Sequence, residues 1–207
     1  MHAQVKNFQR GPAKNYNGLV RYTNILTARY ARLLVIRIDL SFLELYREGV
    51  SLEEFFEYRE KLLGDRRYRP FLKDIVGHAW SLEYAKKTGY HYHMLFFYDG
   101  SKHREDITIG MGIGEQWKKI TGGKGRYYLC NHKKGSYRFC GIGVVDYHDR
   151  IACENLNKAI AYLTKPQLFA KVTGFLEARV RSFGRGVLPK MSPRKGRPRR
   201  KGIHLIS

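Results

Sequence analysis

Apolar and polar residues alternate along three segments of the chain with the period of two that a β-strand imposes on its side chains. These segments are residues 33–42, 79–85 and about 90–98. In 33–42 the apolar side chains share one face, while Arg37 and Asp39 fall on the other, so this strand is predicted to be half-buried. Shorter strands are predicted at 126–131 and 139–146.

Two other segments repeat apolar residues at the helical spacing of three and four. Residues 51–63 begin with Ser51 and carry Glu54 three positions later, which is the pattern of a capping box at a helix N-terminus. Residues 153–165 carry an apolar stripe and are followed by a proline, which cannot continue a helix. A loop and a further helix are expected within 106–125.

Strands that alternate with helices and join through hairpins predict an α+β fold, with one mostly antiparallel sheet and helices packed on one face. Residues 1–30 are polar and rich in Gly and Asn, so an N-terminal arm is expected there. A single folded domain is expected over 31–186. After it, 187–207 is rich in proline, glycine and basic residues, a composition that cannot bury a core and predicts a disordered tail.

The formal net charge of +21 points to a partner rather than to a fold. So large an excess of Lys and Arg indicates a polyanion, and nucleic acid is the first candidate. The three cysteines form no closely spaced pair, which fits a reducing compartment. Neither an apolar leader nor a membrane-spanning segment is recognisable, so a cytoplasmic protein without a membrane partner is expected.

The strand at about 90–98 begins with His91 and His93, which are separated by one residue and therefore point to the same face. If residues 87–89 form a three-residue hairpin loop, with the glycine in the left-handed conformation, Glu83 lies directly opposite His93. Two imidazoles and a carboxylate then converge on the polar face. This set suits Mg²⁺ or Mn²⁺ when phosphate oxygens complete the shell, and it also suits Zn²⁺ or Fe²⁺.

In the predicted helix 153–165, Tyr162 lies off the apolar stripe, together with Lys158 and Lys165. Tyr162 and Lys165 are three residues apart and are therefore neighbours on the helix surface. A free phenol ionises near pH 10, and an adjacent ammonium and a divalent cation would both favour its anion. The pair is a candidate nucleophile. An exposed tyrosine on a basic helix that faces DNA would show the same pattern without any chemistry.

The order of these parts is similar to that of the HUH endonucleases, which initiate rolling-circle replication: an alternating strand, a glutamate, an H-x-H pair and a helical Tyr-x-x-Lys. The sequence motifs most resemble those of the inovirus (filamentous-phage) replication initiators related to the YagK/YfjJ C-terminal domain of bacterial prophages. The segments that carry this resemblance are WSLEYAKKTGYHYHMLFFYDG, IGEQWKKIT, GIGVVDY and KAIAYLTK. It covers most of 33–186.

The resemblance implies an RRM-like or ferredoxin-like nuclease domain in which Glu83, His91 and His93 bind Mg²⁺ or Mn²⁺. It implies that Tyr162, assisted by Lys165, attacks a DNA phosphate, forms a 5′-phosphotyrosyl link and releases a 3′-OH primer. The implied substrate is a single-stranded or supercoiled origin in the cytoplasm of a bacterial host. No nucleotide-binding P-loop is present in the chain, so a host helicase and other replication proteins are the implied partners.

Further residues are candidate DNA contacts. Arg37 and Asp39 lie on the polar face of the first strand, and Lys158 lies on the helix of Tyr162. The segment RKGRPRRKG (194–202) resembles an AT-hook core that could lie in a narrow A·T minor groove, or it is a non-specific electrostatic arm. Its candidate contacts are Arg194, Lys195, Arg197, Arg199 and Arg200.

Three other interpretations stay open. A non-catalytic regulator on the same sheet would use Tyr90, Tyr92 and Phe96 to stack on bases. A small-molecule enzyme, for instance an iron oxygenase, would use the same two histidines and carboxylate, although the high charge argues against it. A relaxase-type enzyme would place its nucleophile near the N-terminus, at Tyr16 or Tyr22.

Overall fold

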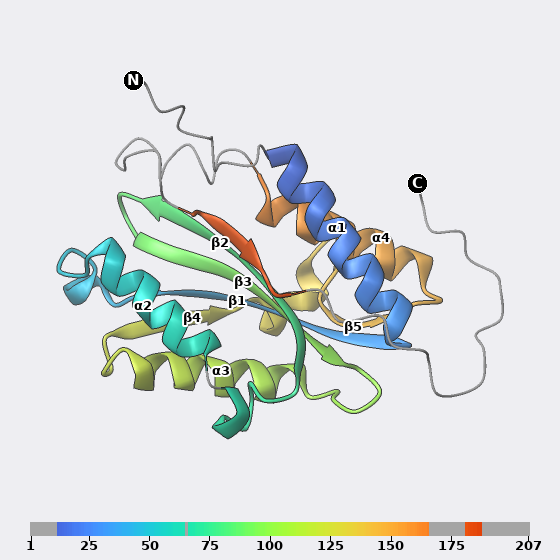
Figure 1. The fold of residues 1–207 in the computed structure, drawn as a ribbon, viewed down its shortest axis with the longest axis horizontal. Helices are drawn as coiled ribbons and strands as arrows, with labels where there is room; N and C mark the ends of the chain where they lie inside the picture. Colours follow the sequence, from blue (N-terminus) through green and yellow to red (C-terminus); the bar gives the residue numbers. More distant parts are fainter. Residues whose placement is uncertain (1–11, 65, 166–180, 188–207) are drawn as a thin grey trace, which may run out of the picture.

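The strand predicted at 33–42 forms at Arg32–Phe42 (β1) and lies inside a six-stranded sheet (Figure 1). The other strands are β2 (Ile75–Ala85), β3 (Gly89–Asp99), β4 (Gly125–Leu129), β5 (Gly143–Asp146) and β6 (Phe183–Arg185). This computed structural model describes residues 12–64, 66–165 and 181–187. Its strands follow the order β4-β1-β3-β2-β6, with β5 paired to the start of β1, and every pairing between them is antiparallel.

The helices form one layer on each face of the sheet (Figure 1). They are α1 (Pro12–Arg29), α2 (Leu52–Leu63), α3 (Asp106–Ile120) and α4 (Arg150–Leu163). The elements β1-α2-β2-β3-α3-β4, with the strand order β4-β1-β3-β2, form a ferredoxin-like βαββαβ unit. The predicted α+β fold is therefore confirmed, and so is the capping box of Ser51 and Glu54 at the start of α2.

The first core lies between the sheet and the layer of α2 and α3. Phe55 of α2 stacks on Tyr92 of β3 with ring centroids 4.5 Å apart, and Trp117 of α3 meets Phe55 edge-on. Alternate residues of β1, such as Ile36 and Ile38, complete this core. Burial of these large side chains supplies most of the stability that the sheet gains on this face.

The second core lies on the opposite face, under α1 and α4. Leu33 and Val35 of β1 and Leu95 of β3 point to this face and are fully buried. The prediction placed all helices on one face of the sheet. In the structure α2 and α3 cover one face, and α1 and α4 cover the other. The cause is that the start of β1 is apolar on both faces, so a second layer must cover it.

The polar arm predicted for 1–30 is wrong over Pro12–Arg29, which form α1. Leu19, Tyr22 and Leu26 recur at helical spacing and are fully buried in the second core. This stripe is narrow, and the polar residues around it hide its periodicity. Residues 1–11 lie outside the described part of the chain, and so does the tail predicted for 187–207, except for Val187.

The other local predictions agree with the structure. The shorter strands form as β4 and β5, and the predicted helix at 153–165 forms as α4, which begins three residues earlier behind the capping side chain of Asp149. All three cysteines are free. None of the helices within the described ranges has the length and apolarity needed to cross a membrane.

A close approach between the segment before β5 and α4 gives a stability prediction. A Cβ at Gly141 would clash with the carbonyl group of Asn155 and lie 2.7 Å from the Cα of Leu156. Because these are backbone atoms, α4 would have to move, and Gly141→Ala is expected to lower the free energy of unfolding by about 2 kcal/mol in urea denaturation. Gly135→Ala is the control, since its Cβ would meet nothing within 4 Å. Equal stability of the two variants would contradict this packing.

Candidate functional site

The second face of the sheet changes from apolar to polar along its two central strands. On β1, Leu33 and Val35 lie beneath α1 and α4, whereas Arg37 and Asp39 follow on the same face. On β3 the apolar residues of this face give way to histidines, and the Cα partner of Asp39 is His93. A polar half-face is therefore left beside the second core, and the candidate site occupies it.

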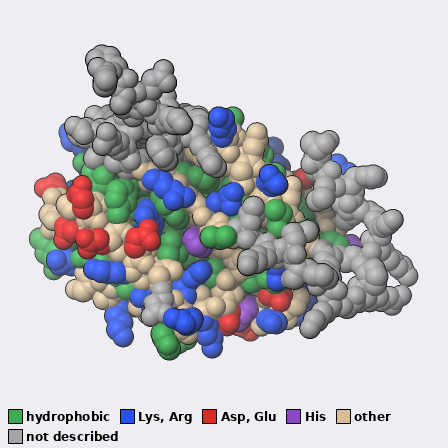
Figure 2. Space-filling view, in the orientation of Figure 1, with side chains coloured by type: hydrophobic (Ala, Val, Ile, Leu, Met, Phe, Trp, Pro, Cys, Tyr) green, Lys and Arg blue, Asp and Glu red, His purple; other side chains and the backbone are tan. Residues whose placement is uncertain are grey.

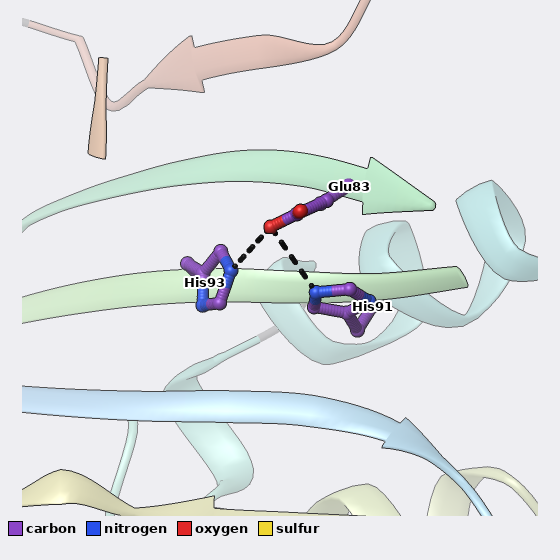
Figure 3. Close-up of side chains that lie close together, drawn as sticks. All are labelled: Glu83, His91 and His93. Atoms are coloured by element: carbon purple, nitrogen blue, oxygen red, sulfur yellow. Dashed lines mark hydrogen bonds and ion pairs between the residues drawn. The ribbon is translucent and has the colours of Figure 1, made fainter. Parts of the chain in front are cut away.

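Glu83, His91 and His93 meet on this polar half-face (Figure 3). Oε2 of Glu83, on β2, lies 3.1 Å from Nε2 of His93 and 3.3 Å from Nε2 of His91, both on β3. One ligand atom from each residue lies within 4.8 Å of the other two. The three side chains are 13 %, 13 % and 7 % exposed, so they are largely shielded from water and still reachable. The metal group predicted from sequence is thus assembled.

The register that assembles this group differs from the predicted one by two residues. Glu83 is paired with His91 and not with His93, and the three-residue loop is 86–88. Gly89 closes the loop and has the expected positive φ of 67°. Because side chains alternate with a period of two, a shift of two residues keeps each of them on its predicted face.

A second set of hydrogen bonds fixes the two imidazole rings. The Nδ1–H of His93 donates to Oδ1 of Asp39 at 2.7 Å, and the Nδ1–H of His91 donates to the carbonyl oxygen of Gly89 at 3.1 Å. We assign these protons from the acceptors that the Nδ1 atoms face. Both Nε2 atoms then point toward Glu83. Histidines that bind metals are oriented in this way, so the group fits a divalent cation.

Hydrogen bonds and opposite charges hold the His-His-Glu group together when no cation is bound. Burial would raise the pKa of Glu83, but its hydrogen bonds with His91 and His93 outweigh burial and hold that pKa well below its usual range. Burial lowers the pKa of His93, whereas its bonds to Asp39 and Glu83 raise it more strongly, to about 9. His93 is therefore an imidazolium at neutral pH, and a cation that binds its Nε2 displaces a proton.

Tyr162, in the last turn of α4, lies beside this group. Its ring meets the ring of His93 nearly edge-on, with centroids 5.9 Å apart. The guanidinium carbon of Arg37 lies 4.4 Å and Nζ of Lys165 lies 4.9 Å from the centroid of the Tyr162 ring. Tyr162 is 36 % exposed, so a molecule that approaches from solvent can reach it. The predicted pair of Tyr162 and Lys165 is in contact, and Arg37 joins it.

Two residues that the sequence suggested only as DNA contacts belong to this site. Asp39 supports His93, and Arg37 lies between Tyr162 and Asp39, with its Nε 3.9 Å from Oδ1 of Asp39. Burial lowers the pKa of Arg37, but the charge of Asp39 and the Tyr162 phenol outweigh it and raise that pKa, so Arg37 stays charged. The alternation in 33–42 correctly predicted that Arg37 and Asp39 share a face. Only the pairing of β1 with β3 could show that Asp39 lies beside His93.

Other candidates do not belong to this group. Nζ of Lys158 lies 3.5 Å from the ring centroid of Phe139. Tyr92 and Phe96 are fully buried in the first core, so the idea that they stack on bases is wrong. Tyr22 is also fully buried and unavailable as a nucleophile. The tail residues lie outside the described part of the chain: Arg194, Lys195, Arg197, Arg199 and Arg200.

Fold and site together define a ferredoxin-like α+β protein with a His-His-Glu group suited to a divalent metal. The family model of the YagK/YfjJ C-terminal domain matches residues 1–186, a range that includes all the described helices and strands, and the chain belongs to this family. Comparisons with curated proteins and with solved structures found no significant match. The family description states no activity, so the likeness to HUH endonucleases is a proposal.

The support that Asp39 gives His93 can be measured through metal binding. Asp39→Asn is expected to weaken Mn²⁺ binding about ten- to a hundredfold in isothermal titration calorimetry, because the His93 ring loses its charged acceptor. Asp74→Asn is the matched control. Asp74 also pairs with a histidine, His103, with 3.6 Å between Oδ2 and Nε2, but it is not part of the Glu83 group. Equal affinities of the two variants would show that Asp39 does not prepare a metal ligand.

The raised pKa of His93 predicts how the metal-free protein responds to pH. The pKa rises from 6.5 to about 9 on folding, so this contribution to stability is complete below pH 6.5 and is lost as pH rises through 9. In EDTA, the free energy of unfolding is therefore expected to fall more steeply between these pH values in the wild type than in His93→Gln. Glu83 acts in the opposite sense: its lowered pKa stabilises the folded state above pH 4.5, and this contribution is lost as pH falls. Parallel pH profiles of the two proteins would refute the assignment.

Proposed function

We propose that this protein is a metal-dependent DNA-nicking and DNA-joining enzyme of the HUH type, which initiates rolling-circle replication with Tyr162 as its nucleophile. The observation that carries the proposal is the 5.9 Å approach of the Tyr162 ring to the ring of His93, from a helix far along the chain. A tyrosine beside a metal group, in a chain with a net charge of +21, suits attack on a phosphodiester.

The residues of the site would have different roles in such a reaction. Glu83, His91 and His93 would hold Mg²⁺ or Mn²⁺, and the bound cation would neutralise charge on the scissile phosphate. Arg37 and Lys165 both lie against the Tyr162 ring, where a phosphate under attack would meet their positive charges. Such cations act most strongly in a partly buried site, because water screens them less there.

The covalent step exchanges one ester bond for another. The Tyr162 oxygen forms a bond to phosphorus and its proton passes to water. The bond between phosphorus and the 3′ oxygen breaks, and that oxygen takes a proton from water and leaves as a 3′-OH. The energy of the phosphodiester is kept in the phosphotyrosyl link. Attack by a 3′-OH on this link reverses the reaction and rejoins the strand without ATP. A bacterial cytoplasm, an origin sequence and a host helicase complete the proposal.

Covalent capture tests this proposal on DNA of every sequence at once, so the origin need not be identified first. A random single-stranded DNA library is incubated with the protein and Mn²⁺, and DNA that stays attached to the protein in SDS is recovered. The wild type is expected to yield an adduct, whereas Tyr162→Phe and the double variant His91→Ala/His93→Ala are expected to yield none. Tyr16→Phe, the control for an N-terminal nucleophile, should retain the adduct.

The other outcomes separate the competing interpretations. An adduct that survives in Tyr162→Phe would remove Tyr162 as the nucleophile, and its loss in Tyr16→Phe would favour the relaxase-type arrangement. Tight DNA binding without an adduct in any protein would favour a non-catalytic regulator and overturn the enzymatic proposal.

A further inference from the structure

We propose that a surface of exposed aromatic and basic side chains beside the site binds single-stranded DNA by stacking with its bases. This aromatic–basic surface consists of Tyr128, Lys133, Tyr137, Arg138, Phe139 and Lys158. The choice of DNA as the polymer rests on the proposed function. The surface itself is argued from contacts that do not involve the chemistry of Tyr162.

The aromatic members are unusually open to solvent. Tyr128 at the end of β4 is 45 % exposed, and Tyr137 and Phe139, in the segment before β5, are 38 % and 48 % exposed. Every residue from 132 to 139 is exposed to solvent. Three large rings on one stretch of polar surface leave apolar area in water, which is typical of a binding surface.

Each end of this surface has a cation close to a ring. Nζ of Lys133 lies 5.9 Å from the ring centroid of Tyr128. The guanidinium carbon of Arg138 lies 5.2 Å and Nζ of Lys158 lies 3.5 Å from the ring centroid of Phe139. Within the described ranges, none of these three cations pairs with a carboxylate. These cations can therefore bind phosphates while the neighbouring rings stack on bases.

The aromatic–basic surface borders the candidate site on two sides. Tyr128 is the β-sheet partner of Asp39, and Lys158 lies one helical turn before Tyr162 on α4. Tyr137 lies close enough to Tyr128 and Arg37 to join them. Burial raises the pKa of its phenol, the neighbouring Tyr128 raises it further, and the charge of Arg37 lowers it.

The surface continues into a groove. Tyr128 and Lys133 line a groove together with Arg126 and His132, which adds further basic and aromatic groups. Figure 2 shows Lys and Arg side chains spread over one view of the molecule, with the largest group of Asp and Glu where α2 begins. Exposed rings stack only on bases whose faces are open, which favours a single strand over a duplex.

Fluorescence anisotropy with the wild-type protein and labelled oligo(dT) in EDTA tests binding apart from chemistry. At moderate salt, which weakens purely electrostatic binding, Tyr128→Leu and Phe139→Leu are each expected to bind about fivefold or more weakly. Phe139→Trp keeps a ring and is expected to bind like the wild type. Tyr68→Leu is the matched control, since Tyr68 is 80 % exposed beside Arg67 but lies outside this surface.

Photo-crosslinking identifies the contacts directly. An oligo(dT) that carries 5-iodouracil is expected to crosslink to Tyr128, Tyr137 or Phe139, as read by mass spectrometry. The proposal is overturned if crosslinks form only elsewhere, if both leucine variants bind like Tyr68→Leu, or if a duplex or an RNA strand binds more tightly than single-stranded DNA.

The two proposals fail in different ways. Loss of binding in the leucine variants without any covalent adduct in the wild type would leave this surface in place and remove the nuclease. A Tyr162-dependent adduct together with unchanged binding in the leucine variants would leave the nuclease in place and remove this surface.

Discussion

The antiparallel pairing of β1 with β3 at the centre of the sheet is the constraint on which the site depends. It runs from Leu33 opposite Asp99 to Leu40 opposite Tyr92, so it also fixes which side chains meet on each face. On the second face it sets Val35 beside Phe97, and four residues further along it sets Asp39 beside His93. The apolar half must be covered, and α1 and α4 cover it. The last turn of α4 thereby brings Tyr162 to the histidines.

The two imidazoles of the polar half-face are held without a cation because each ring nitrogen has an oxygen atom beside it. An unpaired imidazole or carboxylate at this depth would cost several kcal/mol, roughly the cost of burying a charge without a partner. Asp39 and the carbonyl of Gly89 each bind the Nδ1 atom of one ring, and Oε2 of Glu83 lies 3.1 Å and 3.3 Å from the two Nε2 atoms. The bonds that remove this cost also aim both Nε2 atoms at one point. A cation that enters needs to displace protons but not to rebuild the site.

The sequence was sufficient for features that repeat locally. The ligand group could be predicted because alternation fixes the face of a residue, so Glu83 joined both histidines even though the predicted register was two residues off. The role of Asp39 could not be predicted, since nothing local shows which strand lies beside β3. Helix α1 was missed because Leu19, Tyr22 and Leu26 form a narrow stripe in a polar segment. The burial of Tyr92 was missed because nothing local shows that α2 covers the face of β3 opposite the histidines.

The central claim is that the pairing of β1, β2 and β3 prepares one divalent metal site directly beside Tyr162. Anomalous diffraction at the manganese edge, from crystals grown with Mn²⁺, tests it most directly. The account predicts one peak bonded to Nε2 of His91, Nε2 of His93 and the carboxylate of Glu83, with the Tyr162 ring next to it. A peak at another set of ligands, or no peak between these three residues in a crystal that shows the same fold, would contradict it.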